Sequence, residues 1–251
     1  PAPGLPFDFT RTYNSITTSS DGPFGFGWTH SYNLRLEIVD DLLLHGVVVT
    51  YADGHTANFE ESGSGFVSPS GDHNILARES SGYVLTTPAQ LEYHFNESGK
   101  LVSLQDSNDN SVRLSYDGDH LARITDAAGR VYSFEYSGDR ISKIADVLGR
   151  TYEYSYDSNG NLQTYRNPEG GLIQYAYNSE HWLLTLTDPN DHVFVTNTYD
   201  ERGRVIEQRD ASNHLSTIAY PDERTAVISD NLGSVTRHVY DDSLRLIEDK
   251  D

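Results

Sequence analysis

The 251-residue chain contains no cysteine, no methionine and few basic residues. The lack of cysteine excludes disulfide frameworks, zinc sites built from thiolates, and cysteine nucleophiles. Only 18 Lys and Arg residues face 38 Asp and Glu residues, which gives a formal net charge of −20. Such an acidic chain lacks the basic surface of a nucleic-acid-binding protein and the positive charge that holds proteins on anionic membranes. We therefore expect neither nucleic acid nor a membrane surface as a partner.

Long apolar runs and helical periodicity are also lacking. No run approaches the ~18 apolar residues of a membrane span, and no N-terminal segment has the pattern of a signal peptide. Tyrosine, in contrast, occurs 17 times, and Thr, Ser, Gly and Asp are abundant. This composition favours strands and turns, so the sequence predicts an all-β fold with little helix.

The sequence begins Pro1-Ala2-Pro3 and contains no methionine. Translation starts with methionine, so we expect a processed product or a piece of a longer polypeptide. An intact small protein that has lost only its initiator methionine is the alternative.

From about residue 91 onward, a unit of 20 to 22 residues recurs. Its length varies mostly between the closing aromatic residue and the apolar residue that follows. A surface turn tolerates such variation, whereas a one-residue slip in a paired strand moves every side chain to the other face. The spacing therefore predicts two strands and two turns in each unit. The closing aromatic residues are Phe95, Tyr116, Tyr136, Tyr156, Tyr177, Tyr199, Tyr220 and Tyr240.

The residues before each closing aromatic alternate between apolar and polar. Tyr132, Phe134 and Tyr136, for example, are separated by Ser133 and Glu135. This pattern is typical of an antiparallel strand with one buried face. In later units polar residues occupy the apolar face, so we expect looser packing there. These residues are Asn197, Ser216, Thr236 and His238.

The predicted turns have a recurring chemistry. In Asp126-Ala-Ala-Gly129 the aspartate side chain can accept backbone N–H bonds, and the glycine three residues later can supply a positive φ. Asp191 and Asn213 replace this glycine in two units, and both residue types tolerate the left-handed region. A unit of two strands is marginal alone, so the units must stack side by side into a sheet. Similar predicted turns are Asp146 to Gly149 and Asp157 to Gly160.

Two parts of the chain resemble a known family. Tyr156-Asp157 with Gly160, and Tyr199-Asp200-Glu201-Arg202-Gly203-Arg204-Val205, are similar to the Tyr-Asp (YD) repeats of bacterial Rhs proteins. The same repeats occur in insecticidal toxin-complex C subunits, cell-wall-associated Rhs proteins and teneurins. The front of the chain resembles the opening of the Rhs shell. The residues of this shell-opening motif are Arg11, Tyr13, Gly25, Gly27 and Trp28.

The resemblance implies an architecture. Tandem YD-repeat hairpins would stack into a curved, spiralling antiparallel sheet that forms part of a hollow cocoon. Residues 1–90 would form the shell-opening β region, and residues 91–251 a repeat ribbon of seven to eight units. The structural repeat positions are expected at Tyr116, Asp126, Gly129, Tyr136, Asp146, Gly149, Tyr156, Gly160, Tyr177, Tyr199, Gly203, Tyr220 and Tyr240.

The resemblance also implies a function. The chain would be a structural segment of an Rhs-type polymorphic toxin or effector, not an enzyme, with the toxin and a self-cleaving region outside it. Its partners would be the remaining shell, the C-terminal toxin domain and components of a type VI secretion spike. The protein would assemble in the bacterial cytoplasm and then be secreted or delivered to a target cell. The alternative is a secreted or surface carbohydrate-binding module, because aromatic residues beside Asp and Asn are typical of sugar-binding surfaces.

No catalytic, cofactor-binding or metal-binding residue is predicted. The ten histidines show no His-Glu-x-x-His pairing, and the chain has neither a Walker loop nor a dinucleotide-binding glycine motif. The spacings Asp106-x-Asn108-x-Asn110 and Asp157-x-Asn159-x-Asn161 copy the start of a calcium loop. Both lack the glycine at the sixth position and the glutamate at the twelfth. We therefore expect these residues to serve as repeat turns.

Overall fold

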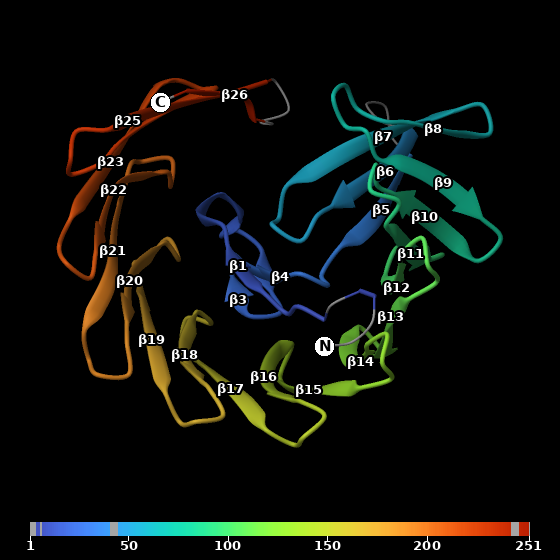
Figure 1. Cartoon of the computed structure of the whole chain (residues 1–251), viewed down its shortest axis with the longest axis horizontal. Coiled ribbons are helices and arrows are strands. Elements are labelled where there is room, and N and C mark those ends of the chain that lie inside the picture. Colours follow the sequence, from blue (N-terminus) through green and yellow to red (C-terminus); the bar gives the residue numbers. More distant parts are fainter. Residues whose placement is uncertain (1–3, 6, 41–44, 242–245, 251) are drawn as a thin grey trace. The chain divides into compact units, whose positions relative to one another are not determined.

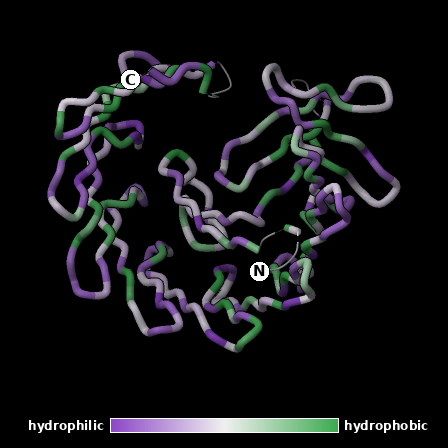
Figure 2. The backbone as a smooth tube through the Cα atoms, in the orientation of Figure 1, coloured by the Kyte–Doolittle hydropathy of each residue, from purple (hydrophilic) through white to green (hydrophobic). Residues whose placement is uncertain are grey.

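The computed structural model of the chain describes residues 4–5, 7–40, 45–241 and 246–250 (Figure 1). Within these residues the fold consists of 26 β-strands and one 3-10 turn at Ser15–Thr17, without any α-helix. Apolar and polar residues alternate along many of the strands (Figure 2). The predicted all-β class of tandem antiparallel hairpins is confirmed. Residues 1–3, on which the expectation of processing depends, lie outside the described residues.

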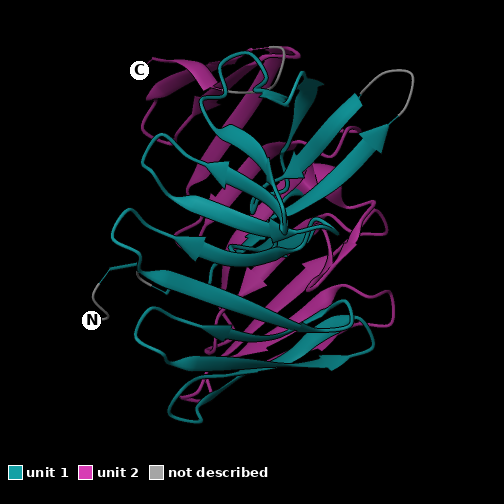
Figure 3. Cartoon of the chain, turned by 90° about the vertical axis from the view of Figure 1, so that its right-hand side faces the viewer, with its two compact units in different colours: residues 1–14, 28–152 teal, residues 15–27, 153–251 magenta. Residues whose placement is uncertain are grey.

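The chain divides into two compact units (Figure 3). The first consists of Pro1–Asn14 and Trp28–Tyr152, and the second of Ser15–Gly27 and Glu153–Asp251. Both units thus combine a short N-terminal segment with a long run of repeat hairpins. The division of the chain at residue 90 into a shell-opening region and a repeat ribbon stays a prediction.

The first unit contains three antiparallel arrangements. β1 (Arg11–Tyr13) pairs with β4 (Trp28–His30). A four-stranded sheet follows in the order β5 (Arg35–Asp40), β6 (His45–Thr50), β7 (Thr56–Ser62) and β8 (Gly65–Val67). In the long sheet each strand pairs with the next in the sequence: β9 (Ile75–Glu79), β10 (Gly82–Thr86), β11 (Glu92–Asn96), β12 (Leu101–Gln105), β13 (Ser111–Asp117), β14 (His120–Thr125), β15 (Val131–Ser137) and β16 (Arg140–Ala145).

The second unit contains two antiparallel arrangements. β2 (Asp21–Gly22) pairs with β3 (Gly25–Phe26). β17 (Thr151–Tyr156) belongs to this unit from Glu153 onward. Sequential antiparallel pairing then continues through β18 (Leu162–Arg166), β19 (Leu172–Tyr177), β20 (Leu183–Thr187), β21 (Val193–Tyr199), β22 (Val205–Asp210), β23 (Leu215–Asp222), β24 (Thr225–Ser229), β25 (Val235–Tyr240) and β26 (Leu246–Lys250).

One face of each long sheet forms the core. In β13, Val112 and Leu114 are buried while Arg113 and Ser115 are exposed, as the alternation predicts. The apolar residue that follows each closing aromatic is also buried in the earlier units. It is at most 5% exposed in the described examples, which are Leu101, Leu121, Ile141, Leu162 and Leu183.

The core face becomes more polar late in the chain. Ser216, Thr236 and His238 are half-buried, so this face is less covered than its equivalent in β13. Asn197 is different, because it is only 9% exposed. Its side-chain amide donates to the carbonyl of Leu183 at 3.0 Å and accepts a bond from Gln208 at 3.0 Å. Burial of this amide is therefore compensated by hydrogen bonds.

A β-bulge marks the closing aromatic of nearly every unit. The register of each hairpin shifts immediately before this residue, so two residues on one strand oppose one on the other. A bulge re-aims the side chain that follows it, and here that side chain is the repeat tyrosine. The shift precedes Phe95, Tyr116, Tyr136, Tyr156, Tyr177, Tyr199 and Tyr240.

Candidate functional site

The turn that begins at Asp126 is a closed five-residue loop. The Oδ1 atom of Asp126 accepts the backbone N–H groups of Ala128 and Arg130, both at 2.9 Å. The N–H of Gly129 donates to the Asp126 carbonyl, and the N–H of Asp126 donates to the Arg130 carbonyl, also at 2.9 Å. Gly129 has a φ of 76°, the left-handed conformation that glycine adopts without steric cost. We name this arrangement the Asp loop.

The Asp loop recurs throughout both units. It follows the second strand of a hairpin, as at Asp126 after β14, and also follows a closing tyrosine, as at Asp157 and Asp200. Where the fourth position is not glycine, it is Asp109, Asp191 or Asn213, with φ between 62° and 63°. The described loops of this kind begin at Asp106, Asp126, Asp146, Asp157, Asp188, Asp200, Asp210 and Asp230.

An arginine closes three of these loops from the fifth position. The Nε atoms of Arg130, Arg150 and Arg204 donate to the second carboxylate oxygen of their loop aspartate, at 2.6, 2.7 and 2.8 Å. The side chain of Asp126 has no solvent exposure, and its charge is paired with the Arg130 guanidinium. The recurring Asp-x-x-Gly-Arg spacing in the sequence could have indicated this ion pair. The turn prediction used only the aspartate and the glycine, and it gave no role to the arginine.

The loop hydrogen bonds also set the protonation of the carboxylate. Burial by itself raises the pKa of Asp126, but hydrogen bonds from the backbone and side chain of Arg130 and from Ala128 outweigh it. The pKa of Asp126 is therefore below its ordinary value. Asp126 is ionised at neutral pH and serves as a fixed acceptor, not as a general acid.

Substitution of Gly129 with valine tests the backbone of the Asp loop. A β-carbon at this position would meet open space, so the cost comes from the positive φ alone. We expect the free energy of unfolding to fall by about 2 kcal/mol, because β-branched residues are strained in the left-handed region. Gly129→Asn is the matched control and should cost much less. Equal midpoints of urea unfolding for the two variants would contradict the left-handed backbone conformation of Gly129.

Closing tyrosines connect a hairpin to the hairpin before it. The hydroxyl of Tyr116 donates to the carbonyl of Leu101 at 2.8 Å, and Tyr199 does the same to Leu183 at 2.8 Å. Tyr220 repeats the contact with the carbonyl of Val205 at 2.9 Å. Burial raises the pKa of Tyr136 to about 12, although a hydrogen bond with the Leu121 backbone lowers it. These phenols therefore remain protonated donors at physiological pH.

The ring of the same tyrosine is covered by a second residue of the preceding hairpin. Lys100 lies over Tyr116 at 5.5 Å, and the rings of His120 and Tyr136 stack at 4.2 Å. The covering residue immediately precedes the buried apolar residue of its unit, and it is cationic or aromatic in these cases. In the sequence alone, nothing relates the position of this covering residue to the closing tyrosine. Further pairs are Trp182 with Tyr199 at 5.4 Å and Arg204 with Tyr220 at 4.2 Å.

Substitution of Tyr116 with phenylalanine isolates the hydroxyl bond. We expect a loss of about 1 kcal/mol of unfolding free energy, because the Leu101 carbonyl loses a donor while the ring packing is kept. Tyr132→Phe is the control, since the Tyr132 ring stacks on Phe7 at 3.7 Å and its hydroxyl makes no bond to a described residue. Thermal unfolding measures the stability of both variants. Equal losses of stability would contradict a stabilising hydrogen bond between Tyr116 and Leu101.

The N-terminal motif contributes aromatic packing to the first unit. The ring of Trp28 lies 5.4 Å from that of Tyr13 and 5.9 Å from the guanidinium of Arg11. On the same unit Phe9 packs on Phe134, a core residue of β15, at 5.5 Å. The shell-opening motif thus helps to build the core in this unit, and its functional role stays a prediction.

His30, in β4, is the most deeply buried titratable group of this motif region. It is 2% exposed, and burial lowers its pKa to about 3. Its Nδ1 atom accepts the backbone N–H of Tyr32 at 3.2 Å, and its ring stacks with that of Phe9 at 4.9 Å. The imidazole is therefore neutral in the folded chain at physiological pH.

The burial of His30 predicts a pH dependence of stability. Below the ordinary histidine pKa of about 6.5, the unfolded chain binds a proton that the folded chain does not. The free energy of unfolding should therefore decrease as the pH falls from about 6.5 to 4.5, with a slope of up to ~1.4 kcal/mol per pH unit. His30→Gln should remove most of this slope in urea unfolding. An unchanged slope would exclude His30 as its source.

In the second unit the glycine-rich segment packs directly on a repeat turn. Gly25 has a φ of 88°, and a β-carbon there would lie 2.5 Å from the carbonyl oxygen of Gly160. Phe24 is fully buried and contacts Tyr154 edge to face at 4.8 Å. Phe26 stacks on His181 at 3.9 Å. Gly25 therefore permits close packing of this segment on the Gly160 turn.

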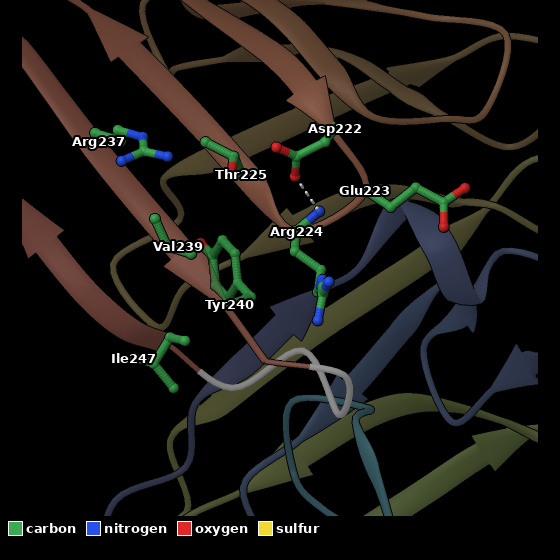
Figure 4. Close-up of a pocket in the computed structure, with 8 residues that line it drawn as sticks. All are labelled: Asp222, Glu223, Arg224, Thr225, Arg237, Val239, Tyr240 and Ile247. Carbon is green, nitrogen blue, oxygen red and sulfur yellow. Dashed lines mark hydrogen bonds between the residues drawn. The ribbon is translucent and has the colours of Figure 1, made fainter.

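No clear catalytic centre emerges from the described residues. They contain no group of three or more His, Asp or Glu side chains arranged to hold a metal ion, and no helix long and apolar enough to cross a membrane. An open pocket of about 530 Å³ lies at β23, β24 and β25 (Figure 4). Its lining includes Arg224, Arg237 and Tyr240, but its Asp222 carboxylate accepts the Arg224 N–H as a turn residue at 2.9 Å. We assign no chemistry to this pocket.

Comparisons with known proteins agree with this geometry. A domain of unknown function, DUF6531, matches residues 1–59, and the teneurin YD-shell family matches residues 73–250. The chain is 26% identical over 251 residues to the probable deoxyribonucleases RhsB and RhsA of Dickeya dadantii (strain 3937). The match covers 95% of this chain but only 17% of each relative.

Solved structures include similar chains at lower identity. The crystal structure of TcdB2-TccC3-TEV matches with a TM-score of 0.40 and 14% identity, over 89% of this chain and 15% of that chain. The family match alone covers well over half of the sequence, and the resemblance to Rhs proteins predicted from the repeats is confirmed. The chain belongs to the teneurin YD-shell family.

Proposed function

We propose that this chain is a structural segment of the shell of an Rhs-type polymorphic toxin or effector, and that the shell encloses a C-terminal toxin domain. The observation that carries the proposal is the connection between successive hairpins. Tyr116 in β13 uses its hydroxyl on the backbone of Leu101 and its ring on the side chain of Lys100, both in the preceding hairpin, and Tyr220 repeats both contacts with Val205 and Arg204. Side chains used in this way hold neighbouring hairpins together, and among the described residues they leave no recognisable catalytic group.

The proposal assigns no catalytic step to this segment. RhsB and RhsA are named probable deoxyribonucleases, and the chain spans only 17% of their length. We propose that a toxin activity and a self-cleaving region belong to other parts of the full-length protein. Assembly in the bacterial cytoplasm, delivery to a target cell and contact with type VI secretion spike components are further parts of this proposal.

Recovery of the chain from its native cells tests the proposal. We expect it within a much larger polypeptide, or bound to the remaining shell and a small toxic domain that resists added protease. Denatured mass measurement of the purified material, before and after protease treatment, distinguishes these states. A free species near 28 kDa without companions would overturn encapsulation.

The carbohydrate-binding alternative requires aromatic faces that are free to stack on sugars. The ring of Tyr116 is covered by Lys100, and the ring of Tyr220 by Arg204. This coverage favours the structural role. Retention on a glycan array that is lost on substitution of Tyr220 by leucine, in a variant that still folds, would support the alternative instead.

A further inference from the structure

Three Asp loops carry asparagine at their third position, at Asn108, Asn159 and Asn190. In each loop the asparagine N–H donates to Oδ1 of the first aspartate, at 2.9, 2.8 and 2.8 Å. The N–H of the next residue donates to the carbonyl of that aspartate, at 3.1 Å in all three. All three asparagines are exposed. The loops are thus close structural copies.

They differ in the residue that follows the asparagine. This residue is Asp109 in the first loop, Gly160 in the second and Asp191 in the third. Its φ is positive in every case, at 63°, 85° and 62°. Gly160 is buried and its N–H bonds to the Asp157 carbonyl, so the attack requires this bond to open. Of the three loops, only this one has no side chain on the residue whose backbone nitrogen would approach the asparagine amide.

We propose that Asn159 is a site of spontaneous deamidation in the folded chain. The backbone nitrogen of Gly160 attacks the side-chain carbonyl carbon of Asn159, a new C–N bond forms, and the amide nitrogen leaves as ammonia with the displaced proton. Water then opens the resulting succinimide at either carbonyl, which leaves aspartate or isoaspartate at this position. Water is the only co-reactant, and the exposure of Asn159 gives it access.

The position of Asn159 gives its modification a structural consequence. The neighbouring Gly160 carbonyl lies against Gly25. Asn161, which is 1% exposed, bonds to Asp157 at 2.9 Å and to His181 at 2.6 Å. Isoaspartate adds one atom to the backbone, and either product places a second carboxylate beside that of Asp157.

Deamidation would therefore loosen the packing between this loop and the segment Phe24 to Gly27. Phe26 stacks on His181, and His181 in turn bonds to Asn161. A displacement of the loop backbone would therefore also displace the segment Phe24 to Gly27. Deamidation of Asn159 would be slow and irreversible, so the modified fraction would increase with the age of the folded chain. The equivalent residue Asn108 precedes Asp109 and would be modified much more slowly.

Peptide mapping of the folded chain, held at mildly alkaline pH and physiological temperature, tests the proposal. Because only glycine lacks a side chain at the attacking residue, Asn159 should convert roughly tenfold or more faster than Asn108 and Asn190. Conversion is read as a mass increase of about 1 Da and by the isoaspartate content of each peptide. Equal rates at the three sites, or conversion of Asn159 only in the urea-unfolded chain, would overturn it.

A matched variant and a second measurement complete the test. Asp109→Gly places an Asn-Gly pair in the first loop, where a φ of 63° suits glycine. Asn108 should then convert at a rate close to that of Asn159, and a rate unchanged from the parent chain would contradict the assigned cause. In aged protein the amides of residues 24–27 should exchange hydrogen faster; unchanged protection would contradict the loosened contact.

Discussion

Replacement of Asp126 with alanine is expected to lower the free energy of unfolding by about 3 kcal/mol. The Asp126 carboxylate accepts two backbone N–H groups and the Arg130 guanidinium, and its side chain has no solvent exposure. Alanine leaves these donors without an acceptor in a site that water reaches poorly. Hydrogen bonds to charged groups are individually strong, but partial exposure of Arg130 limits the total. Urea unfolding monitored by circular dichroism measures the change.

Asp188→Ala is the matched control for this prediction. Asp188 begins the same loop and accepts the N–H groups of Asn190 and His192 at 2.8 and 2.9 Å. Its side chain is 30% exposed, and its fifth-position partner is a histidine at 3.6 Å instead of an arginine. Water can replace the lost acceptor there, so the loss should be clearly smaller. An equal loss at both sites would show that burial of Asp126 adds nothing.

Replacement of Gly25 with alanine is expected to cost about 3 kcal/mol of unfolding free energy. Two effects add. The φ of 88° is strained for any residue with a β-carbon, and the β-carbon would lie 2.5 Å from the Gly160 carbonyl oxygen. That atom belongs to the backbone of an Asp loop, so it cannot move aside without disturbing Asp157 and the buried Asn161.

Gly170→Ala separates the two effects. Gly170 has a φ of 86°, and a β-carbon there would meet nothing within 4 Å. It therefore carries the backbone strain without the clash, at a cost of about 1 kcal/mol. Calorimetric melting of both variants gives the difference. Equal melting temperatures would mean that the contact between Gly25 and Gly160 does not contribute to stability.

The repeat hairpins were predictable because their signals are local. The alternation at Tyr132, Phe134 and Tyr136 lies within one strand, and one buried face makes its register unambiguous. The turn chemistry at Asp126 and Gly129 lies within four residues. For the same reason the sequence predicted the positive φ at Asp191 and Asn213, where short polar side chains replace glycine.

The contacts between hairpins were not predictable, because they join residues that no local pattern relates. The register shifts before Tyr116, and its hydroxyl donates to the carbonyl of Leu101, fifteen residues earlier. Lys100 lies over the ring of the same tyrosine. Periodicity placed Leu101 and Tyr116 in strands and Lys100 in a turn, but only the paired register brings them together.

The sequence by itself determined the class, the repeat period, the strand and turn alternation and the family, because each depends on spacing along the chain. Tertiary structure alone decided which atoms hold successive hairpins together and why Gly25 must be glycine. The reason is physical: hydrogen bonds and steric limits act between atoms that are close in space. The Gly160 carbonyl that excludes a β-carbon at Gly25 is supplied by a loop far along the sequence.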